Sequence, residues 1–254
     1  MQEIDGFGDR KVTGKVKAVI FDMDNTLFDF VEAKLRACRA VVEYLGVGDE
    51  EELLKYFLRG THGFEDLENI ADYMRDKGIY SQEKYEECCR IYDDVKLSNI
   101  EPYPHVRETL EKLRNMGLKL AVVTDALNGH ALSRLRKAGL LHLFDVVVSA
   151  DMTGKKKPEP DSIKLALQKL GVDAKEAILV GDSVRRDIEA GKRLGMVTVY
   201  AAYGDRNFFE DKSGEADFTL KKIQLLINVI HNITKAFATD SKRSMVAKED
   251  NILL

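Results

Sequence analysis

The sequence contains few cysteines. There are three in 254 residues, Cys38, Cys88 and Cys89, and the last two are adjacent. An odd number of cysteines with two side by side does not make a disulfide framework. The adjacent pair also lacks the histidine or second cysteine pair that a zinc site needs. We therefore expect the thiols to pack in the interior of a protein from a reducing compartment.

Long apolar runs are missing as well. No run reaches the roughly 18 residues that a membrane span requires. The first residues, MQEIDGFGDRKVTGKVK, hold no apolar run between their charges. Such a start is unlike a secretory signal peptide or an anchor. The sequence predicts a cytoplasmic protein without a membrane partner.

Neither sign of charge dominates the composition. Lysine and arginine number 39, aspartate and glutamate number 43, and the formal net charge is -4. A chain with this balance has no overall attraction for a polyanion, so we expect no nucleic-acid partner. The hydrophobic fraction of 44% and charged fraction of 32% are those of a globular protein. The length allows one domain or two small ones.

Short apolar segments alternate with helical patterns over most of the chain. The apolar segments are KAVIF, LKLAVVTDA, FDVVVSAD, EAILVGDS and MVTVYAA. They are rich in valine and isoleucine without polar alternation, which is typical of strands covered on both faces. The helical patterns RETLEKLRNMG, SIKLALQKLG and RRDIEAGKRLG each end at a glycine, the usual stop signal. This order predicts an α/β fold: a Rossmann-like parallel sheet with helices on both faces.

Residues 30–100 interrupt the alternation. Four helical patterns follow one another there without a convincing strand: FVEAKLRACRAVVEYLG, DEEELLKYFLRG, FEDLENIADYMRDKG and SQEKYEECCRIYDDV. Pro102 and Pro104 then disfavour further helix and mark a return to the main domain. We predict a core domain of residues 1–29 and 101–234 with an inserted helical domain of residues 30–100. The polar residues 235–254 are predicted to form a flexible tail.

Polar residues follow the predicted strands at their carboxyl ends, where ligands bind an open parallel sheet. The first strand is followed by Asp22, Asp24 and Thr26, the second ends in Thr124 and Asp125, and the fourth is followed by Asp182, Ser183 and Asp187. The loop after the third strand carries three lysines, of which Lys157 directly precedes Pro158. The topology therefore predicts that several carboxylates and a lysine meet at one edge of the sheet.

A single aspartate after a strand is usually a turn residue or a helix N-cap, which is enough to explain Asp125 or Asp187 alone. It does not explain the cluster, because carboxylates gathered in one place repel one another unless a cation neutralises them. Oxygen ligands without clustered histidine or cysteine favour a hard ion. The sequence therefore predicts a Mg²⁺ cofactor.

Four segments, in chain order, resemble the four motifs of the haloacid dehalogenase superfamily: DMDNT, the VVTDA segment, the KKKPEP loop and GDSVRRD. With their spacing they cover roughly Val16 to Tyr203. The helical insertion after the first motif resembles the C1-type cap of subfamily I. The resemblance implies a hydrolase of the phosphatase branch, with a core domain of this superfamily and an inserted helical cap domain.

The resemblance also implies a role for each motif residue. Asp22 matches the nucleophile, which attacks a phosphoryl group and becomes an aspartyl-phosphate. Asp24 matches the general acid/base, which protonates the leaving alcohol and then deprotonates the hydrolytic water. Thr124 matches the hydroxyl that binds a phosphate oxygen, together with the backbone N–H groups of Asp125 and Ala126.

The remaining motif residues match groups that supply or balance charge. Lys157, directly before proline, matches the lysine that neutralises the nucleophile and the transferring group. Asp182 matches a direct metal ligand, together with the Asp22 carboxylate and the Asp24 backbone carbonyl, and Asp187 matches a residue that holds metal-bound water or Lys157. Positioning and charge neutralisation are most of what phosphoryl transfer requires. The resemblance thus implies a Mg²⁺-dependent phosphatase acting on a small phosphorylated metabolite.

Three other functions stay open at this point. A phosphomutase resembling β-phosphoglucomutase would keep every core motif and differ mainly in how the cap excludes water. A haloacid dehalogenase has no leaving alcohol to protonate and typically lacks an acid at the position of Asp24, which argues against that activity. A non-catalytic binding protein would be expected to have lost a motif residue, and none is lost.

The segment LRGTHGFEDL resembles the substrate-specificity loop of such caps. This makes Arg59, Thr61 and His62 candidates for contacting the leaving group when the cap closes. A helix end followed by a solvated turn at Gly60 and Gly63 explains the same residues equally well. The sequence leaves open which of the two holds, which metabolite is bound, and whether the protein is a monomer or a homodimer.

Overall fold

The computed structural model describes residues 15–206 and 215–235. The chain divides into two compact units, one formed by Met1–Phe28 with Pro102–Leu254 and the other by Asp29–Glu101. The predicted tail of residues 235–254 lies outside the described residues, apart from Lys235. Each unit has its own core and is described separately below.

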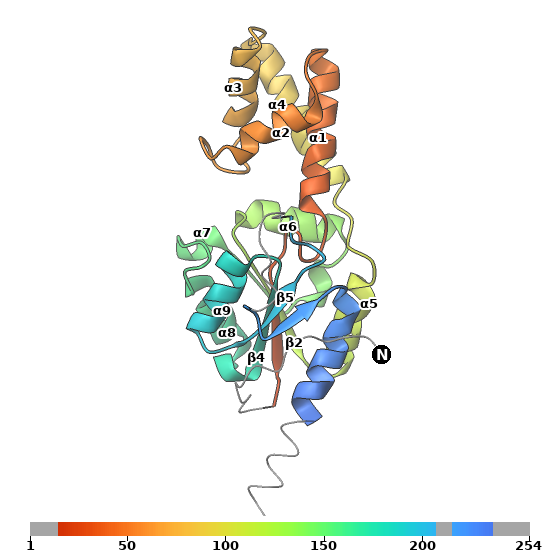
Figure 1. Cartoon of the computed structure of the whole chain (residues 1–254), viewed down its shortest axis with the longest axis vertical. Helices are drawn as coiled ribbons and strands as arrows, with labels where there is room; N and C mark the ends of the chain where they lie inside the picture. Colours follow the sequence, from red (N-terminus) through yellow and green to blue (C-terminus); the bar gives the residue numbers. More distant parts are fainter. Residues whose placement is uncertain (1–14, 207–214, 236–254) are drawn as a thin grey trace, which may run out of the picture. The chain divides into compact units, whose positions relative to one another are not determined.

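A parallel sheet forms the centre of the first unit (Figure 1). In the described residues its order is β3-β2-β1-β4-β5-β6 and every neighbouring pair is parallel. The strands are β1 (Ala18–Phe21), β2 (Lys119–Thr124), β3 (Val146–Ser149), β4 (Ala177–Gly181), β5 (Val197–Ala201) and β6 (Phe218–Leu220). All four residues of β1 are buried, because helices cover both faces of the sheet. This architecture confirms the predicted parallel α/β fold.

The edge strand β6 is absent from the sequence-based prediction. It has three residues, FTL, and pairs with β5 at the end of the sheet. Three residues are too few to show either alternation or an apolar run, so the sequence carried no usable signal for it.

Helices cover both faces of the sheet, with α8 and α9 on one side and α5 on the other (Figure 1). Side chains of α8 one helical turn apart, among them Ile163, Ala166 and Leu170, pack against Ile20 and Val123 of the strands. The α-helices of this unit are α5 (Val106–Asn115), α6 (Asn128–Lys137), α7 (Ala150–Thr153), α8 (Asp161–Leu170) and α9 (Glu189–Arg193), followed by helical residues 226–235. Short 3₁₀ turns occupy Leu141–Leu143, Ala174–Glu176 and Ile223–Leu225.

The segment RRDIEAGKRLG differs from the single helix that its pattern predicts. It begins as a π-helix over Val184–Ile188 and continues as α9. The wider π turn places the Asp187 carboxylate so that its Oδ2 accepts from the backbone N–H of Ser183 at 3.0 Å. The departure from α-helix therefore lies at one of the predicted site residues, as π turns often do.

The second unit consists of four helices: α1 (Phe30–Leu45), α2 (Glu50–Leu58), α3 (Glu68–Asp76) and α4 (Gln82–Ser98). Asp29 caps α1 by accepting from the backbone N–H of Glu32 at 3.0 Å, and Gly46 ends it with φ of 69°. Cys38 and Cys88 lie in the apolar core of this unit, and all three cysteines are free thiols. Among the described residues, no helix has the length and apolar character that crossing a membrane demands.

Candidate active site

The carboxyl ends of β1, β2 and β4 lie close together at one edge of the sheet. Phe21, the last residue of β1, pairs with Val122 of β2 and with Val180 of β4. Asp22 follows β1 directly, and its backbone N–H donates to the Val180 carbonyl at 2.8 Å. The sheet order turns here, since the chain places β2 on one side of β1 and β4 on the other. Such a point is where open α/β sheets bind ligands.

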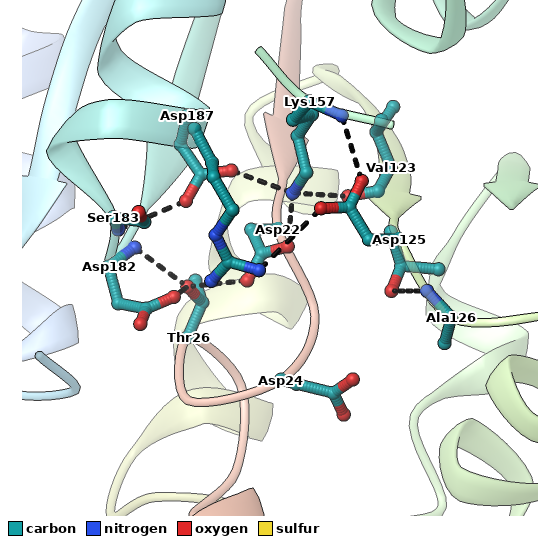
Figure 2. Close-up of polar contacts among 12 residues, drawn as sticks. Asp22, Asp24, Thr26, Val123, Asp125, Ala126, Lys157, Asp182, Ser183 and Asp187 are labelled. Carbon is teal, nitrogen blue, oxygen red and sulfur yellow. Dashed lines mark hydrogen bonds and ion pairs between the residues drawn. The ribbon is translucent and has the colours of Figure 1, made fainter. Parts of the chain in front are cut away.

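Lys157 is buried among carboxylates at this edge. Its ammonium group forms an ion pair with Asp22, lies 2.6 Å from Asp187 Oδ1, and donates to the Val123 carbonyl at 3.2 Å (Figure 2). Burial by itself lowers the pKa of Lys157, but the charges of Asp187 and Asp22 outweigh it and raise that pKa. The lysine is therefore a permanent positive charge beside Asp22.

Asp22, Asp182 and Asp187 form a buried acidic cluster. One carboxylate oxygen from each lies within 4.8 Å of the others. Burial, followed by the charges of the neighbouring aspartates, raises the pKa of Asp182 well above its ordinary range. Burial also raises the pKa of Asp187, although Lys157 opposes the shift. Lys157 and the nearby guanidinium of Arg186 supply two positive charges against these three carboxylates. One negative charge remains, so this oxygen-only set fits a hard divalent cation.

Thr26 joins the loops after β1 and β4. Its hydroxyl lies 3.2 Å from Asp22 Oδ2 and 3.2 Å from Asp182 Oδ1, and it accepts from the Asp182 backbone N–H at 3.1 Å. The hydroxyl can donate to one carboxylate at a time. The sequence pattern included Thr26 in the polar run but assigned it no role. The structure shows that it sets the spacing of two predicted site residues.

The loop after β5 supports the same region, and nothing in the sequence pattern pointed to it. Tyr203 donates its hydroxyl hydrogen to the Thr26 carbonyl at 2.9 Å. A side chain at Gly204 would overlap the carbonyl oxygen of Asn25, so only glycine allows this close approach. The tight contact holds the loop that carries Asp22 and Thr26 against the sheet.

The predicted phosphate-binding residues lie at the end of β2. The Thr124 hydroxyl oxygen accepts from the Ala126 backbone N–H at 3.2 Å, which orients its own hydrogen elsewhere. Asp125 Oδ1 accepts from the Lys157 backbone N–H at 3.0 Å. The Arg186 side chain is 44% exposed, and its Nη1 lies 3.6 Å from Asp125 Oδ2. Figure 2 shows Asp125 and Ala126 to the right of Asp22, with Lys157 above it.

Asp24 is separated from the acidic cluster. Figure 2 shows its carboxylate turned away from Lys157 and Asp182. Its Oδ2 accepts from Nη1 of Arg134, in α6, at 2.7 Å. The Arg134 side chain is 3% exposed and that of Asp24 is 20% exposed. Nothing in the sequence pattern singled out Arg134, because a basic residue on an amphipathic helix is ordinarily solvated.

The candidate specificity residues belong to the second unit. Arg59 forms an ion pair with Asp72, and its guanidinium lies 4.3 Å from the Tyr56 ring centroid. His62 Nε2 lies 2.9 Å from the same Asp72 carboxylate, whereas Thr61 is exposed. Two of these candidates are therefore tied to Asp72 of α3, within the second unit.

Comparison with known proteins agrees with this arrangement. A family model described as haloacid dehalogenase-like hydrolase matches residues 19–201. A glyceraldehyde 3-phosphate phosphatase of Methanocaldococcus jannaschii is 32% identical over 233 residues, which are 87% of this chain and 99% of the relative. A phosphoglycolate phosphatase of Aquifex aeolicus is 32% identical over 219 residues, covering 85% of this chain and 98% of the relative.

Solved structures show the same architecture. The crystal structure of a candidate beta-phosphoglucomutase from Thermotoga maritima superposes with a TM-score of 0.72 at 27% identity. The match covers 85% of this chain and 99% of that structure. The shared fold thus spans nearly the whole of the compared protein.

Proposed function

We propose that this chain, which belongs to the haloacid dehalogenase-like hydrolase family, is a Mg²⁺-dependent phosphatase that hydrolyses a small phosphomonoester through an aspartyl-phosphate. The observation that carries the proposal is the buried contact of Lys157 with both Asp22 and Asp187 at the carboxyl end of β1. A carboxylate beside a fixed cation, in a buried site, suits attack on an anionic phosphoryl group.

The first chemical step would be carried by Asp22 and Asp24. A carboxylate oxygen of Asp22 forms a bond to phosphorus while the bond from phosphorus to the alcohol oxygen breaks. The bonding pair goes to the alcohol oxygen, which takes a proton from Asp24 and leaves. Lys157 neutralises the charge that Asp22 and the phosphoryl oxygens bring together.

In the second step Asp24 acts as the base. It takes a proton from water as the water oxygen attacks phosphorus, and the bond between phosphorus and Asp22 breaks. Inorganic phosphate leaves and Asp22 is restored as a carboxylate. We assign Thr124 and the backbone N–H groups of Asp125 and Ala126 to the phosphoryl oxygens. The Thr124 hydroxyl supports this assignment, because its oxygen accepts from Ala126 and leaves its hydrogen available. The Ala126 N–H, which donates to Thr124 in this structure, would turn to a phosphoryl oxygen when substrate binds.

We propose that Mg²⁺ is held by the carboxylates of Asp22 and Asp182 and by the backbone carbonyl of Asp24, with Asp187 holding metal-bound water or Lys157. The proposal is supported by the buried oxygen cluster and by the raised pKa values of Asp182 and Asp187, which are caused first by burial and then increased by the neighbouring carboxylates. When bound, the ion would screen negative charge on the phosphoryl oxygens. The protein residues hold the phosphoryl group in place and move the protons.

The substrate class is proposed from the relatives. They are named for glyceraldehyde 3-phosphate and phosphoglycolate, so we propose a small phosphorylated metabolite and a cytoplasmic enzyme, in keeping with its three free thiols. Residues 30–100 are proposed to act as the cap, with Arg59, Thr61 and His62 selecting the leaving group. Their identity as specificity residues is supported by their place between α2 and α3 in that unit.

The experiment that tests this function is phosphate release by purified protein. p-Nitrophenyl phosphate, D-glyceraldehyde 3-phosphate, phosphoglycolate and sugar phosphates are supplied with Mg²⁺ or with EDTA. We expect Mg²⁺-dependent release from p-nitrophenyl phosphate and from at least one metabolite, and no release by the Asp22→Asn variant. Absence of release from every compound, or equal release by Asp22→Asn, would contradict the proposal.

A sugar phosphomutase is the second candidate function. It is favoured by the similarity to the candidate beta-phosphoglucomutase structure, and its chemistry would use the same aspartyl-phosphate. The two activities differ in the acceptor, which is water in a phosphatase and a second sugar hydroxyl in a mutase. Conversion of a sugar 1-phosphate to the 6-phosphate without release of inorganic phosphate would identify the mutase.

A further inference from the structure

We propose that Arg134 is a positioning residue for Asp24: it holds the general acid/base on the leaving-group side of the site. The inference rests on the proposed phosphatase function and adds a residue to it. Arg134 lies outside all four sequence motifs, in α6, and reaches Asp24 across 110 positions of sequence.

The contact is specific and buried. Nη1 of Arg134 donates to Oδ2 of Asp24 at 2.7 Å, the distance of a charge-assisted hydrogen bond. The Arg134 side chain is almost fully enclosed, while that of Asp24 keeps 20% of its surface exposed. Asp24 is thus anchored through one carboxylate oxygen, while its side chain as a whole stays partly exposed.

The direction of Asp24 fits protonation of a leaving group. In-line transfer places the leaving oxygen on the far side of phosphorus from the attacking Asp22 oxygen. A general acid must approach from that side, away from Lys157 and the acidic cluster. Figure 2 shows the Asp24 carboxylate turned in such a direction, and Arg134 is the side chain that binds it there.

The effect of fixing the Asp24 carboxylate on the reaction rate depends on the substrate. An alcohol leaving group must be protonated as it departs, and a positioned acid contributes about 10²–10⁴-fold to such a step. The p-nitrophenolate anion leaves without a proton. A residue that acts through Asp24 therefore affects the first step with an alkyl phosphate and has little effect on the first step with p-nitrophenyl phosphate. Hydrolysis of the aspartyl-phosphate uses Asp24 as its base with either substrate, so the two substrates are compared in the first turnover. A residue that only stabilises the fold affects both alike.

The test compares Arg134→Met with Arg136→Met, which removes an exposed arginine from the same helix. For Arg134→Met we expect the first-turnover rate of alcohol release from an alkyl phosphate, glycerol 3-phosphate or D-glyceraldehyde 3-phosphate, to fall about 10²-fold. KM and the first-turnover rate of p-nitrophenol release should change little. Asp24→Asn should give the same pattern, and adding Arg134→Met to it should cause no further loss. Arg134→Lys should recover part of the alkyl phosphate rate.

Equal losses of the first-turnover rate on both substrates in Arg134→Met, or an alkyl phosphate rate equal to that of Arg136→Met, would overturn the positioning role. Circular dichroism and the unfolding midpoint show whether Arg134→Met is folded, and Arg134→Lys serves in its place if it is not. The two proposals fail differently. Wild-type protein that releases no phosphate from any substrate removes the phosphatase function, whereas active wild-type protein with an unselective Arg134→Met defect removes only the role of Arg134.

Discussion

The ammonium group of Lys157 lies 2.6 Å from Asp187 Oδ1, and both side chains are almost wholly buried. Asp187 follows β4, whereas Asp22, the other acidic partner of Lys157, follows β1. The lysine therefore balances two carboxylates from neighbouring strands. Buried charges are tolerated when they are paired, so the folded state and the proposed chemistry depend on the same cation.

Replacing this lysine should cost both stability and activity. In Lys157→Met, the carboxylates of Asp22 and Asp187 lose their shared cation, and removal of one partner of a buried ion pair costs about 3–5 kcal/mol. We expect that loss in the unfolding free energy measured by urea titration in EDTA, together with loss of phosphatase activity. Lys156→Met, at an exposed position of the same loop, is the control. Equal stability of the two variants would contradict the account.

Asp182→Asn should raise the stability of the metal-free protein and weaken Mg²⁺ binding. The substitution removes one charge from the crowded cluster and keeps an oxygen that can accept from Thr26. The metal-free protein should become more stable, because the substitution removes a charge that is disfavoured first by burial and then by repulsion from Asp22 and Asp187, the causes of the raised pKa of Asp182. The rise in unfolding midpoint that Mg²⁺ produces in wild-type protein should disappear. Full retention of the Mg²⁺ effect would remove Asp182 as a ligand.

The stability of metal-free protein should fall as pH rises. The folded-state pKa values of Asp182 and Asp187 are raised above their ordinary value of 3.8. Between the ordinary and the raised values, the folded protein holds protons that the unfolded chain has released. We expect the unfolding free energy in EDTA to decrease from about pH 4 toward neutrality, and stabilisation by Mg²⁺ to grow over the same range. A metal-free stability that rises through this window would contradict the charge assignment.

Lys34 should hold the loop between α2 and α3 of the second unit. It is fully buried, donates to the Phe64 carbonyl, and lies 3.6 Å and 4.2 Å from the ring centroids of Phe64 and Phe57. Lys34→Met keeps the volume but loses the donor and the cation–π contacts, which should cost about 1–2 kcal/mol. Hydrogen exchange of residues 59–67 should accelerate, whereas the exposed-site variant Lys55→Met should leave it unchanged. Equal exchange in both would exclude this role.

Much of the site follows from the order of elements along the chain. Strand ends of a parallel sheet lie at one edge, so apolar runs that end in Asp22, Thr124 and Asp182 already predict a shared site. In the structure these residues lie at the neighbouring carboxyl ends of β1, β2 and β4. Local periodicity was enough here because each residue is placed by the strand immediately before it.

Contacts that depend on tertiary packing could not be predicted in this way. Arg134 and Tyr203 reach the site across 110 and 177 positions of sequence, and each has an ordinary local pattern. The π turn at Asp187 was missed because its residues also fit an α-helical period. Edge strand β6 was missed because three residues carry too little pattern. These features depend on which elements become neighbours in the folded protein, and local sequence patterns do not determine which elements those are.

The sharpest test of the proposed mechanism is to trap the phosphoryl group on Asp22. The Asp24→Asn variant is mixed with p-nitrophenyl phosphate and Mg²⁺. The p-nitrophenolate leaving group needs no proton, so the first step proceeds. Hydrolysis of the aspartyl-phosphate lacks its base, so the intermediate accumulates. The reaction is quenched with acid, and peptides are analysed by mass spectrometry. We expect a burst of p-nitrophenol equal in molar amount to the enzyme, and a phosphoryl group on Asp22. A phosphoryl group on another residue, or turnover with no covalent intermediate, would contradict it.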